Sequence, residues 1–473
     1  MSAPTPPQRG DNPQGAVPPL RAPAPLRRQA VLDAWWPLAA SWLLMGVELP
    51  LLSAHVARLP DPEVQLAAYG SLVFPICLLI EAPIIMLLAA STALCTDLDR
   101  FRRVRRWMHV AGGALTALHV LLAATPLYGA VASGLLGLPD DVADAGRAAL
   151  WLMTPWTWTI AYRRFHQGVL IRAGKSRAVG VGTLVRVGTG LSVLQLGLHT
   201  AVDLGLPGAV VGAAAVAASV TVEAVFVGWI VRPVVAESLR EPEPGTPPLE
   251  LREFLSFYVP LALTPLLTLV IQPIGAAAMA RMPRDLDSLA AWPAVHGLVF
   301  LFRSFGFALN EVVVARVRDV DGYPVLRRFA FQLAGVLVGS LVLVALTPLG
   351  ELWFGAVSGL SPELTALSSA SLLLAALMPG YQTLQSLYQG VLVATGRTRP
   401  VTEAVALYLV VASLALWIGA EVDAVAGLYA ALGGFTIAGL LQTAWVGWRA
   451  QASLKEMRES GKASGTENQS QVD

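Results

Sequence analysis

Long apolar runs constrain this chain more than any other feature of its sequence. Between Asp33 and Arg449, runs of about 20 apolar residues recur, and each is long enough to cross a bilayer as a helix. Of the 473 residues, 55% are hydrophobic and only 14% are charged, a balance typical of membrane proteins. The sequence therefore predicts an integral, multi-pass, all-α membrane protein.

We predict twelve spans, with boundaries good to a few residues. They run approximately over residues 33–57, 66–96, 107–131, 148–171, 178–203, 208–236, 253–279, 286–315, 328–350, 364–394, 400–420 and 424–448. Residues 1–30 and 451–473 are polar, and we expect them to be disordered tails. Residues 238–252, rich in Pro and Glu, are expected to link two halves of the membrane region.

The two halves are related by an internal repeat. The pattern of Pro, Ala and Arg in residues 37–68 recurs in residues 260–291, 223 positions later, and the motif beginning at Gln167 recurs at Gln389. Each repeat contains six spans, an even number, so both repeats enter the membrane from the same side. We therefore predict two parallel six-helix lobes, an N-lobe (31–237) and a C-lobe (253–450), related by a pseudo-two-fold axis along the membrane normal. Two such lobes suit transport by alternating access around a central site.

The orientation follows from the basic residues, which gather in alternate loops. These loops hold Arg100, Arg102, Arg103, Arg105, Arg106, Arg172, Lys175, Arg177, Arg232, Arg240, Arg252, Arg316, Arg318, Arg327, Arg328, Arg397 and Arg399. The other loops are short or acidic. By the positive-inside rule, both termini are expected in the cytoplasm, with the chain in the inner or plasma membrane.

An ionisable side chain inside a span is a candidate for function because it is expensive to place there. Glu48 lies two residues before Pro50, which bends the first span and leaves room beside a carboxylate that can bind H⁺ or Na⁺. Pro273 is the equivalent helix-kink position in the second repeat. The alternative is that Glu48 lies hydrated and idle near the outer mouth.

Glu81 and Arg303 also lie in the middle of spans, and they occupy equivalent positions of the two repeats. One hypothesis is a charge pair across the cavity, made in one access state and broken in the other. The alternative is that each pairs within its own lobe. Glu81 is therefore a second candidate for the coupling ion, and Arg303 a candidate for the substrate.

Further polar residues in the spans are candidates for lining the cavity. Arginines there would favour an anionic substrate, because guanidinium groups suit phosphate and carboxylate, although those next to the cytoplasm could instead snorkel into water. The candidates are Arg163, Arg164, Arg186, Glu223, Gln272, Glu311, Gln382 and Gln385. Gly168 and Gly390 are expected to be packing points for close helix approach.

Several other functions lack their sequence signatures. Gly174-Lys175-Ser176 does not complete a P-loop, the six histidines show no metal-ligand spacing, and no nucleophile-base group stands out. We predict no enzyme, no cofactor, no metal and no nucleic acid partner. The expected partners are a small-molecule substrate, H⁺ or Na⁺ and the lipid bilayer, and the expected state is a monomer.

The start of the second repeat resembles the progressive ankylosis family. The resemblance is carried by residues 255–263, by Pro273, Ile274 and Arg281, by residues 66–70, and more loosely by Pro293, His296 and residues 309–311. That family is grouped with the multidrug and toxic compound extrusion (MATE) transporters and the lipid-linked oligosaccharide flippases, whose fold is two six-helix bundles in a V. The resemblance implies export, either of pyrophosphate, nucleotides and citrate or of organic cations in exchange for H⁺ or Na⁺. Glu48 beside Pro50 is similar to the acidic residue of MATE coupling sites, which is an Asp there.

The lead hypothesis is a cation-coupled secondary exporter of small organic or anionic solutes. A major facilitator would carry glycines in its loop between the second and third helices, and Asp99-Arg100-Phe101-Arg102-Arg103 lacks them. A flippase for a lipid-linked precursor stays open, as does a regulator that does not transport. An intramembrane enzyme is disfavoured by the internal duplication.

Overall fold

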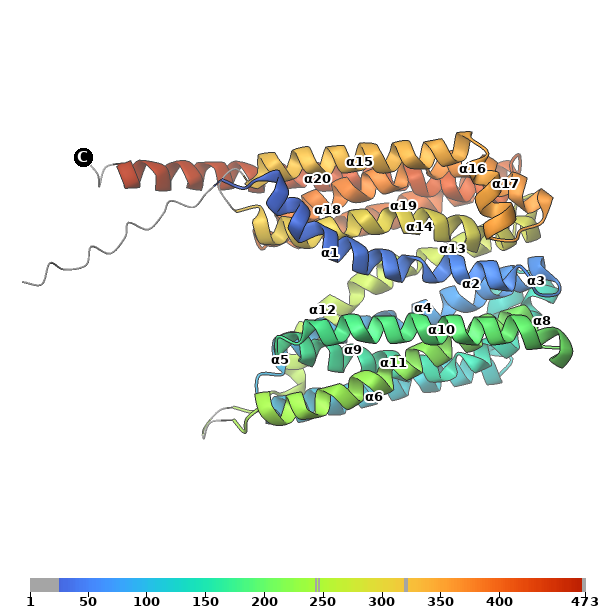
Figure 1. Ribbon diagram of the computed structural model, residues 1–473, viewed down its shortest axis with the longest axis horizontal. Helices are drawn as coiled ribbons and strands as arrows, with labels where there is room; N and C mark the ends of the chain where they lie inside the picture. The colour runs from blue at the N-terminus through green and yellow to red at the C-terminus, as the bar shows by residue number, and fades with distance from the viewer. Residues whose placement is uncertain (1–24, 243–244, 246, 319–321, 470–473) are drawn as a thin grey trace, which may run out of the picture.

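The computed structural model describes residues 25–242, 245, 247–318 and 322–469, and every regular element in that part of the chain is a helix (Figure 1). The first repeat comprises α1 (Arg28–Gly46), α2 (Glu48–Val56), α3 (Pro62–Ala67), η1 (Ala68–Val73), α4 (Phe74–Ile85), α5 (Leu87–Leu94), α6 (Leu98–Ala124), α7 (Leu127–Gly129), η2 (Ala130–Leu135), α8 (Asp140–Leu152), α9 (Thr154–Arg172), α10 (Ser176–Leu204) and α11 (Gly208–Ser238). The second comprises α12 (Leu251–Leu269), α13 (Ile271–Met279), α14 (Asp285–Arg316), α15 (Gly322–Leu346), α16 (Leu349–Glu351), η3 (Leu352–Val357), α17 (Pro362–Ala375), α18 (Met378–Ala394), α19 (Arg399–Val422) and α20 (Gly427–Gln469). The η elements are short π-helical turns.

Eleven stretches of the described chain are long and apolar enough to cross a membrane. The one expected span that is missing from these eleven is the fourth, 148–171. It corresponds to the end of α8 and to α9, which meet at Met153. Its hydropathy is low because α9 carries Arg163, Arg164, His166 and Gln167. The polar side chains that hide this span from a hydropathy scan are largely those of the site described below.

The prolines break the first span of each repeat at equivalent places. The first span divides into α1 and α2 at Val47, and the seventh into α12 and α13 at Val270. Pro50 and Pro273 each follow the break by three residues and lack the backbone N–H that would continue the helical hydrogen bonding. Both breaks thus lie one helical turn before the prolines singled out in the sequence.

The turns of the two repeats also correspond. Asp61 and Arg284, 223 positions apart, both adopt left-handed backbone conformations (φ 52° and 57°) before α3 and α14. Gly174 and Gly396, 222 positions apart, do the same with φ of 73° and 74°. The internal repeat expected from sequence is thus present in the backbone.

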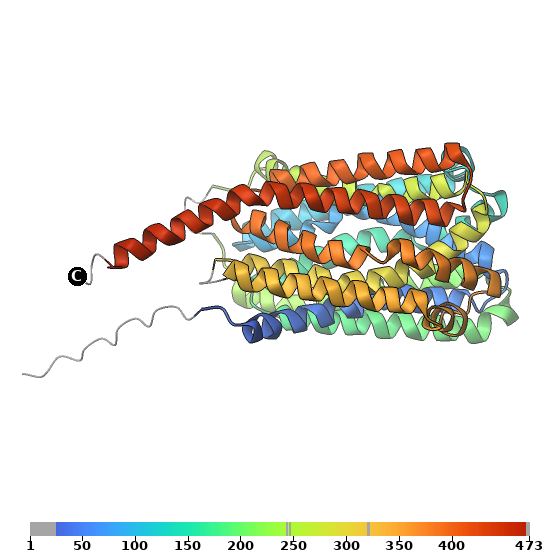
Figure 2. The ribbon, with the colours of Figure 1, turned by 90° about the horizontal axis from the view of Figure 1, so that it is seen from above.

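The helices form two bundles that meet at one end (Figure 1). Both ends of the described chain lie at the opposite end, here called the terminal end, as Figures 1 and 2 show. At the far end the bundles touch directly: Ser71 Oγ donates to the Leu289 carbonyl at 2.7 Å, and a Cβ on Gly70 would lie 2.5 Å from Pro293. Gly70 and Pro293 are equivalent positions of the two repeats, so this contact lies near the pseudo-two-fold axis.

Toward the terminal end, where the bundles separate, the first span of each repeat crosses over to the other bundle (Figure 1). α1 packs against α14 and α15 of the second repeat, and Trp35 Nε1 donates to the Phe305 carbonyl at 3.0 Å. In the same way α12 packs against α4 of the first repeat, where the Tyr258 hydroxyl donates to the Pro83 carbonyl. The first half-helix of each repeat therefore lies on the bundle built by the other repeat.

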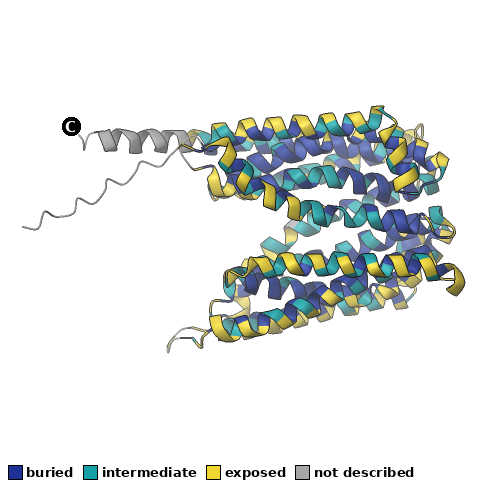
Figure 3. Ribbon diagram, viewed as in Figure 1, coloured by how far each residue is buried: buried dark blue, intermediate teal, exposed yellow. Residues whose placement is uncertain are grey.

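Burial follows the expectation for a membrane protein. Buried side chains fill the inside of each bundle, while exposed ones lie on its outer faces (Figure 3). Many exposed side chains are large and apolar, among them Val225, Trp229, Leu346 and Trp448, which suits contact with lipid rather than water. The polar tail expected over 451–473 is helical up to Gln469, as a continuation of α20, and its last residues lie outside the described part, as do residues 1–24.

Candidate functional site

Six charged side chains converge inside the N-lobe. They come from five helices and comprise Glu48 (α2), Glu81 (α4), Arg163 and Arg164 (α9), Arg186 (α10) and Glu223 (α11). All except Glu223 line a cavity of about 140 Å³, together with aromatic residues such as Tyr69 and Trp156. With three carboxylates and three guanidinium groups, the cluster is electrically neutral when every member is ionised.

Glu223 is the fully buried centre of this cluster, with 0% of its side chain exposed. Its Oε2 accepts a hydrogen bond from Arg163 Nη1 at 2.5 Å and lies 3.6 Å from Arg186 Nε. Its Oε1 accepts from Gln167 Nε2 at 2.9 Å. A buried carboxylate with this many partners is well compensated, so Glu223 orders the arginines around it.

Arg186 connects this buried centre to Glu48. Its Nη2 lies 3.1 Å from Glu48 Oε2, and the Glu48 side chain is 24% exposed, against 0% for Glu223. Glu48 is the first residue of α2, directly after the break that precedes Pro50. The helix break thus places a carboxylate at the accessible edge of a buried ion-pair network.

Glu81 is the least compensated member of the cluster. Its side chain is buried, and its Oε2 has no hydrogen-bond partner among the described residues. Arg164 Nε is likewise buried and unpartnered within the described chain. Leaving a buried carboxylate oxygen without a donor is unfavourable, so this position suits a proton or a small cation.

The site depends on the close approach of α9 to α5. A Cβ on Gly168 would lie 2.0 Å from Ser91 Oγ and 2.2 Å from the Leu88 carbonyl, so only glycine fits there. In the second repeat, a Cβ on Gly390 would lie 2.6 Å from Val313. Both glycines are packing points, as expected, and the close contact at Gly168 holds the face of α9 that carries Arg163 and Gln167 in place.

The C-lobe has a different charge arrangement, centred on Arg303 of α14. Its Nη2 donates to Gln382 Oε1 at 2.7 Å, and its guanidinium carbon lies 5.6 Å from the Phe307 ring centroid. No carboxylate of the described residues lies within 4.0 Å of this guanidinium, and its Nε is buried without a partner. Within the described chain, Arg303 is therefore a cation without a counter-ion inside a membrane helix.

Arg303 belongs to a half-exposed face of α14 that is otherwise aromatic. His296, Phe300, Arg303 and Phe307 follow one another at helical spacing. The ring centroids of Phe300 and Phe307 are 5.8 Å apart, and Trp42 of α1 stacks on Phe307 at 5.0 Å. This face could hold a ligand with a flat apolar part and a negative group.

The remaining sequence candidates lie elsewhere. Gln385 is buried within the C-lobe, where its Nε2 donates to Gln442 Oε1 and Thr443 Oγ1 at 3.0 Å. Glu311 is exposed near the terminal end of α14, beside Trp42, and Gln272 is half-buried in α13. None of these three lines the N-lobe cavity.

The hypothetical charge pair between Glu81 and Arg303, one of two alternatives considered from the sequence, is not formed in this conformation. Glu81 lies with the arginines of its own lobe, and Arg303 bonds to Gln382 of its own lobe. Sequence reasoning did not assign Gln167 to the site. Its position four residues after Arg163, on the same helix face, is the signal that could have found it.

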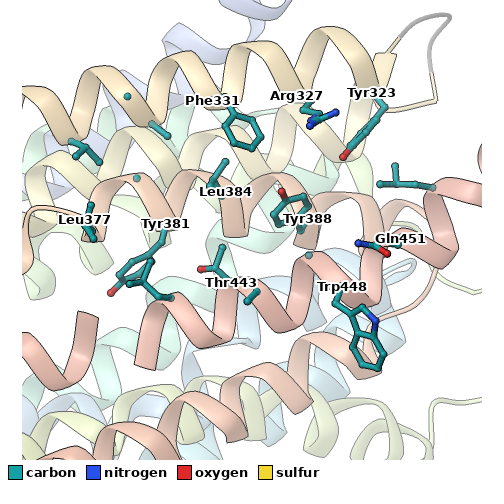
Figure 4. A pocket seen from close by; sticks show the side chains of 18 residues that line it. Tyr323, Arg327, Phe331, Leu377, Tyr381, Leu384, Tyr388, Thr443, Trp448 and Gln451 are labelled. Atoms are coloured by element: carbon teal, nitrogen blue, oxygen red, sulfur yellow. The ribbon is translucent and has the colours of Figure 1, made fainter. Parts of the chain in front are cut away.

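A larger cavity, of about 870 Å³, lies away from these candidates on the outer face of the C-lobe. It is a groove between α15, α18 and α20, lined mainly by apolar and aromatic side chains, with Arg327 and Gln451 near one end (Figure 4). Gln385 and the other candidate site residues do not line it. Size alone therefore does not locate the functional site.

Comparison with solved structures identifies the fold. The chain is similar to an inward-facing multidrug resistance MATE family transporter of the MOP superfamily, with a TM-score of 0.63 and 15% identity over 89% of this chain and 99% of that one. It is similar to a mutant form of the Vibrio cholerae MATE transporter VcmN (TM-score 0.61, 18% identity, 91% and 98% covered). It is also similar to a Pyrococcus furiosus MOP superfamily transporter described as having a binding pocket of reverse polarity (TM-score 0.57, 14% identity, 91% and 99% covered).

At these identities the likeness establishes the fold, which is that of MATE transporters, and confirms the two-lobe prediction. The major facilitator alternative is thereby set aside. No protein-family model matches the chain, and no curated protein sequence matches it either. The closer likeness to progressive ankylosis proteins stays a prediction.

Proposed function

We propose that this chain, which has the fold of MATE transporters, is a secondary active exporter that works by alternating access and is driven by H⁺ or Na⁺. It moves small organic or anionic solutes out of the cell across the inner or plasma membrane. The observation that carries this proposal is the largely buried cluster of charged side chains in the N-lobe, in which Glu48 and Glu81 line one cavity. Placing charged side chains inside a membrane-spanning lobe costs free energy, so their presence there indicates a function such as transport.

Glu48 is the proposed entry point for the coupling ion. Among the described residues its only ion-pair partner is Arg186, and it is the most exposed carboxylate of the cluster. A proton or Na⁺ on Glu48 cancels its attraction for Arg186, which then stays with Glu223 alone. Because Glu48 begins α2 next to the break at Val47, this exchange changes the contact between α2 and α10. The unpartnered Glu81 Oε2 offers a second position in the same cavity.

Arg303 favours an anionic group on the substrate. A guanidinium inside a membrane helix gains most from a carboxylate or phosphate when the protein supplies no counter-ion. The aromatic face of α14 around it suits a substrate with a flat apolar part. The described reverse polarity of the binding pocket in the Pyrococcus furiosus transporter is consistent with a fold that is not confined to cationic substrates.

The orientation proposed from the basic loops makes the terminal end cytoplasmic. The bundles meet at the far end and separate toward the terminal end, so this conformation faces the cytoplasm (Figure 1). An exporter in this state loads its substrate from inside the cell. Alternating access then requires the contacts at the far end to open.

The test is export from cells that express the chain, with two panels measured in parallel. One panel contains cationic dyes and drugs, and the other measures pyrophosphate, nucleotides and citrate in the medium. Each is repeated with Glu48→Gln and with Glu421→Gln, a control carboxylate that is exposed at the end of α19. We expect anion release by the wild type, lost in Glu48→Gln and kept in Glu421→Gln.

Other outcomes distinguish the alternatives. Dye extrusion that requires Glu48 would keep the coupling proposal and replace the anionic substrate by a cationic one. Export that is the same in Glu48→Gln and wild type would refute the coupling role. Absence of export in both panels would favour a flippase for a lipid-linked precursor.

A further inference from the structure

We infer that Arg58 and Arg281 form a reciprocal latch that closes the far end of the transporter, the outer end in the proposed orientation. Each arginine stands at the end of a proline-broken span, after α2 and after α13, and the two are 223 positions apart in the repeat. Each donates hydrogen bonds to backbone carbonyls of the opposite lobe. The inference rests on the alternating-access part of the proposed function.

Arg58 reaches from the N-lobe to the end of η3 in the C-lobe. Its Nη2 donates to the carbonyls of Ala356 and Val357, both at 2.9 Å. Its Nη1 donates to the Ala54 carbonyl of its own helix at 2.5 Å, which holds the side chain in position. One planar guanidinium thus bridges the two lobes.

Arg281 makes the matching contacts in the other direction. Its Nη2 donates to the Leu135 carbonyl at 2.8 Å and its Nη1 to the Leu136 carbonyl at 2.7 Å, both at the end of η2 in the N-lobe. Its Nη1 also donates to the Ala277 carbonyl of its own helix at 2.5 Å. Leu135 and Val357 are equivalent positions, so one acceptor of each set follows the pseudo-two-fold symmetry, and the second acceptor is its neighbour on one side or the other.

Two glycines make room for these guanidinium groups. Gly137 and Gly359 both have positive φ, 66° and 73°, and each lies just after the acceptor carbonyls of its loop. A Cβ on Gly359 would lie 2.9 Å from Arg58 Nη1, and a Cβ on Gly137 would lie 3.0 Å from the guanidinium of Arg281. Each loop therefore presents bare backbone to the arginine of the other lobe.

The chemistry of the contact suits a latch that opens repeatedly. Both arginines are exposed, so water can replace each carbonyl when the lobes part. The acceptors are neutral carbonyls, so opening leaves no unpaired carboxylate behind. While both sets of bonds are made, the lobes cannot separate at this end, and a substrate held between them cannot leave outward.

The test measures the opening of the far end without a substrate, so that its outcome does not depend on what is transported. Spin labels are placed at Leu206→Cys in the N-lobe and Glu363→Cys in the C-lobe, two exposed positions at this end, with Cys77 and Cys95 replaced by Ala. Pulsed electron–electron distance measurement then compares the wild-type background with Arg58→Gln/Arg281→Gln in proteoliposomes.

We expect a single short distance between the two spin labels when both arginines are present. In the double variant we expect a major population with a longer distance, and each single variant should give an intermediate population. Arg284→Gln is the matched control, because Arg284 is exposed at the same end but pairs with Asp287 of its own helix at 2.8 Å. A double variant with the same distance distribution as the control would overturn the latch.

A second set of variants keeps the positive charges at positions 58 and 281. Gly137→Ala and Gly359→Ala are expected to displace the guanidinium groups and to lengthen the distance partially, while Arg58→Lys/Arg281→Lys should be intermediate because an ammonium cannot match the planar fork. A distance that stays short in all of these variants would show that the arginines do not hold the end closed. If the distance between the labels changes as expected but the wild type exports no solute of either panel, the result would count against the proposed function alone.

Discussion

Glu223 and Glu81 are both buried carboxylates of one cluster, yet their surroundings give them different roles. Glu223 is hydrogen-bonded by Arg163 and Gln167 and lies near Arg186, so its charge is matched on every side. Glu81 has an oxygen without any donor in the described chain. The first arrangement stabilises the lobe, and the second leaves capacity to bind an ion.

Glu223→Gln is therefore expected to destabilise the protein strongly, because it leaves the buried guanidinium of Arg163 without its counter-charge and leaves Arg186 with Glu48 alone. Breaking a buried pair by removing one partner costs about 3–5 kcal/mol. Thermal unfolding in detergent should show a clearly larger decrease in melting temperature for Glu223→Gln than for Glu81→Gln. Glu237→Gln, an exposed carboxylate on the same helix, is the control. Equal stability of Glu223→Gln and Glu237→Gln would contradict the structural role.

Arg303→Gln is expected to weaken binding of an anionic substrate while leaving the fold intact. A hydrogen bond to a charged group contributes about 1.5–3 kcal/mol, which corresponds to roughly 10- to 100-fold in affinity. The measurement is the substrate concentration at half-maximal export for wild type and variant. Arg327→Gln, which removes an exposed arginine from the outer groove, should leave this concentration unchanged. The same shift in both variants would point to a general charge effect.

Sequence identified most of these side chains but not their pairing. Ionisable groups are rare in membrane spans, so each of them stands out in the sequence by itself, as Glu48, Glu81 and Arg303 do. Which carboxylate meets which arginine depends on the rotation and packing of five helices, which no local pattern specifies. Glu81 and Arg303 are the example: their equivalence in the repeat suggested a pair, and tertiary packing gives each of them other neighbours.

Among the helices, α9 shows how packing and charge depend on one another. It carries three members of the buried network, and its contact with α5 has no space for a side chain at residue 168. The polar face also lowers its hydropathy, so α9 is not among the eleven stretches of the described chain that are apolar enough to cross a membrane, although its span was predicted from the sequence. By contrast, the breaks at Val47 and Val270 follow directly from proline chemistry and were predictable.

Gly168→Ala is expected to separate α9 from α5 and to destabilise the N-lobe by about 1–3 kcal/mol, the usual range for overpacking. The added methyl group would meet both a side chain and a backbone carbonyl of α5. Gly180→Ala on α10 is the matched control, since nothing lies within 4 Å of its added Cβ. The control should be neutral or slightly stabilising, because alanine favours a helix over glycine. Equal melting temperatures for the two variants would argue against close packing at Gly168.

The whole molecule is predicted to lie in the membrane with its terminal end in the cytoplasm. A fluorescent protein fused after Asp473 should then fold and fluoresce, and a secreted phosphatase fused there should be inactive. The same two reporters inserted between Pro139 and Asp140, at the far end, should behave in the opposite way. A reporter that behaves in the same way at both positions would contradict the orientation assigned from the positive-inside rule.

The two-lobe architecture was predictable because a repeat with an even number of spans leaves only the parallel arrangement. The exchange of α1 and α12 between the bundles was not. Both half-helices lie inside apolar spans, and hydropathy carries no information about which bundle a lipid-compatible helix will join.

That exchange also sets the order in which the protein can be completed during synthesis. Trp35 of α1 bonds to Phe305, which follows it by 270 residues. At about 5–20 residues per second, the ribosome needs roughly 15–50 s to supply that partner. Throughout this interval α1 has entered the membrane without its final neighbour, exposing a surface that contains Trp35 and Val31. During synthesis, lipid or the insertion machinery therefore has to cover this surface of α1 until the second repeat has been inserted and α1 can pack against it.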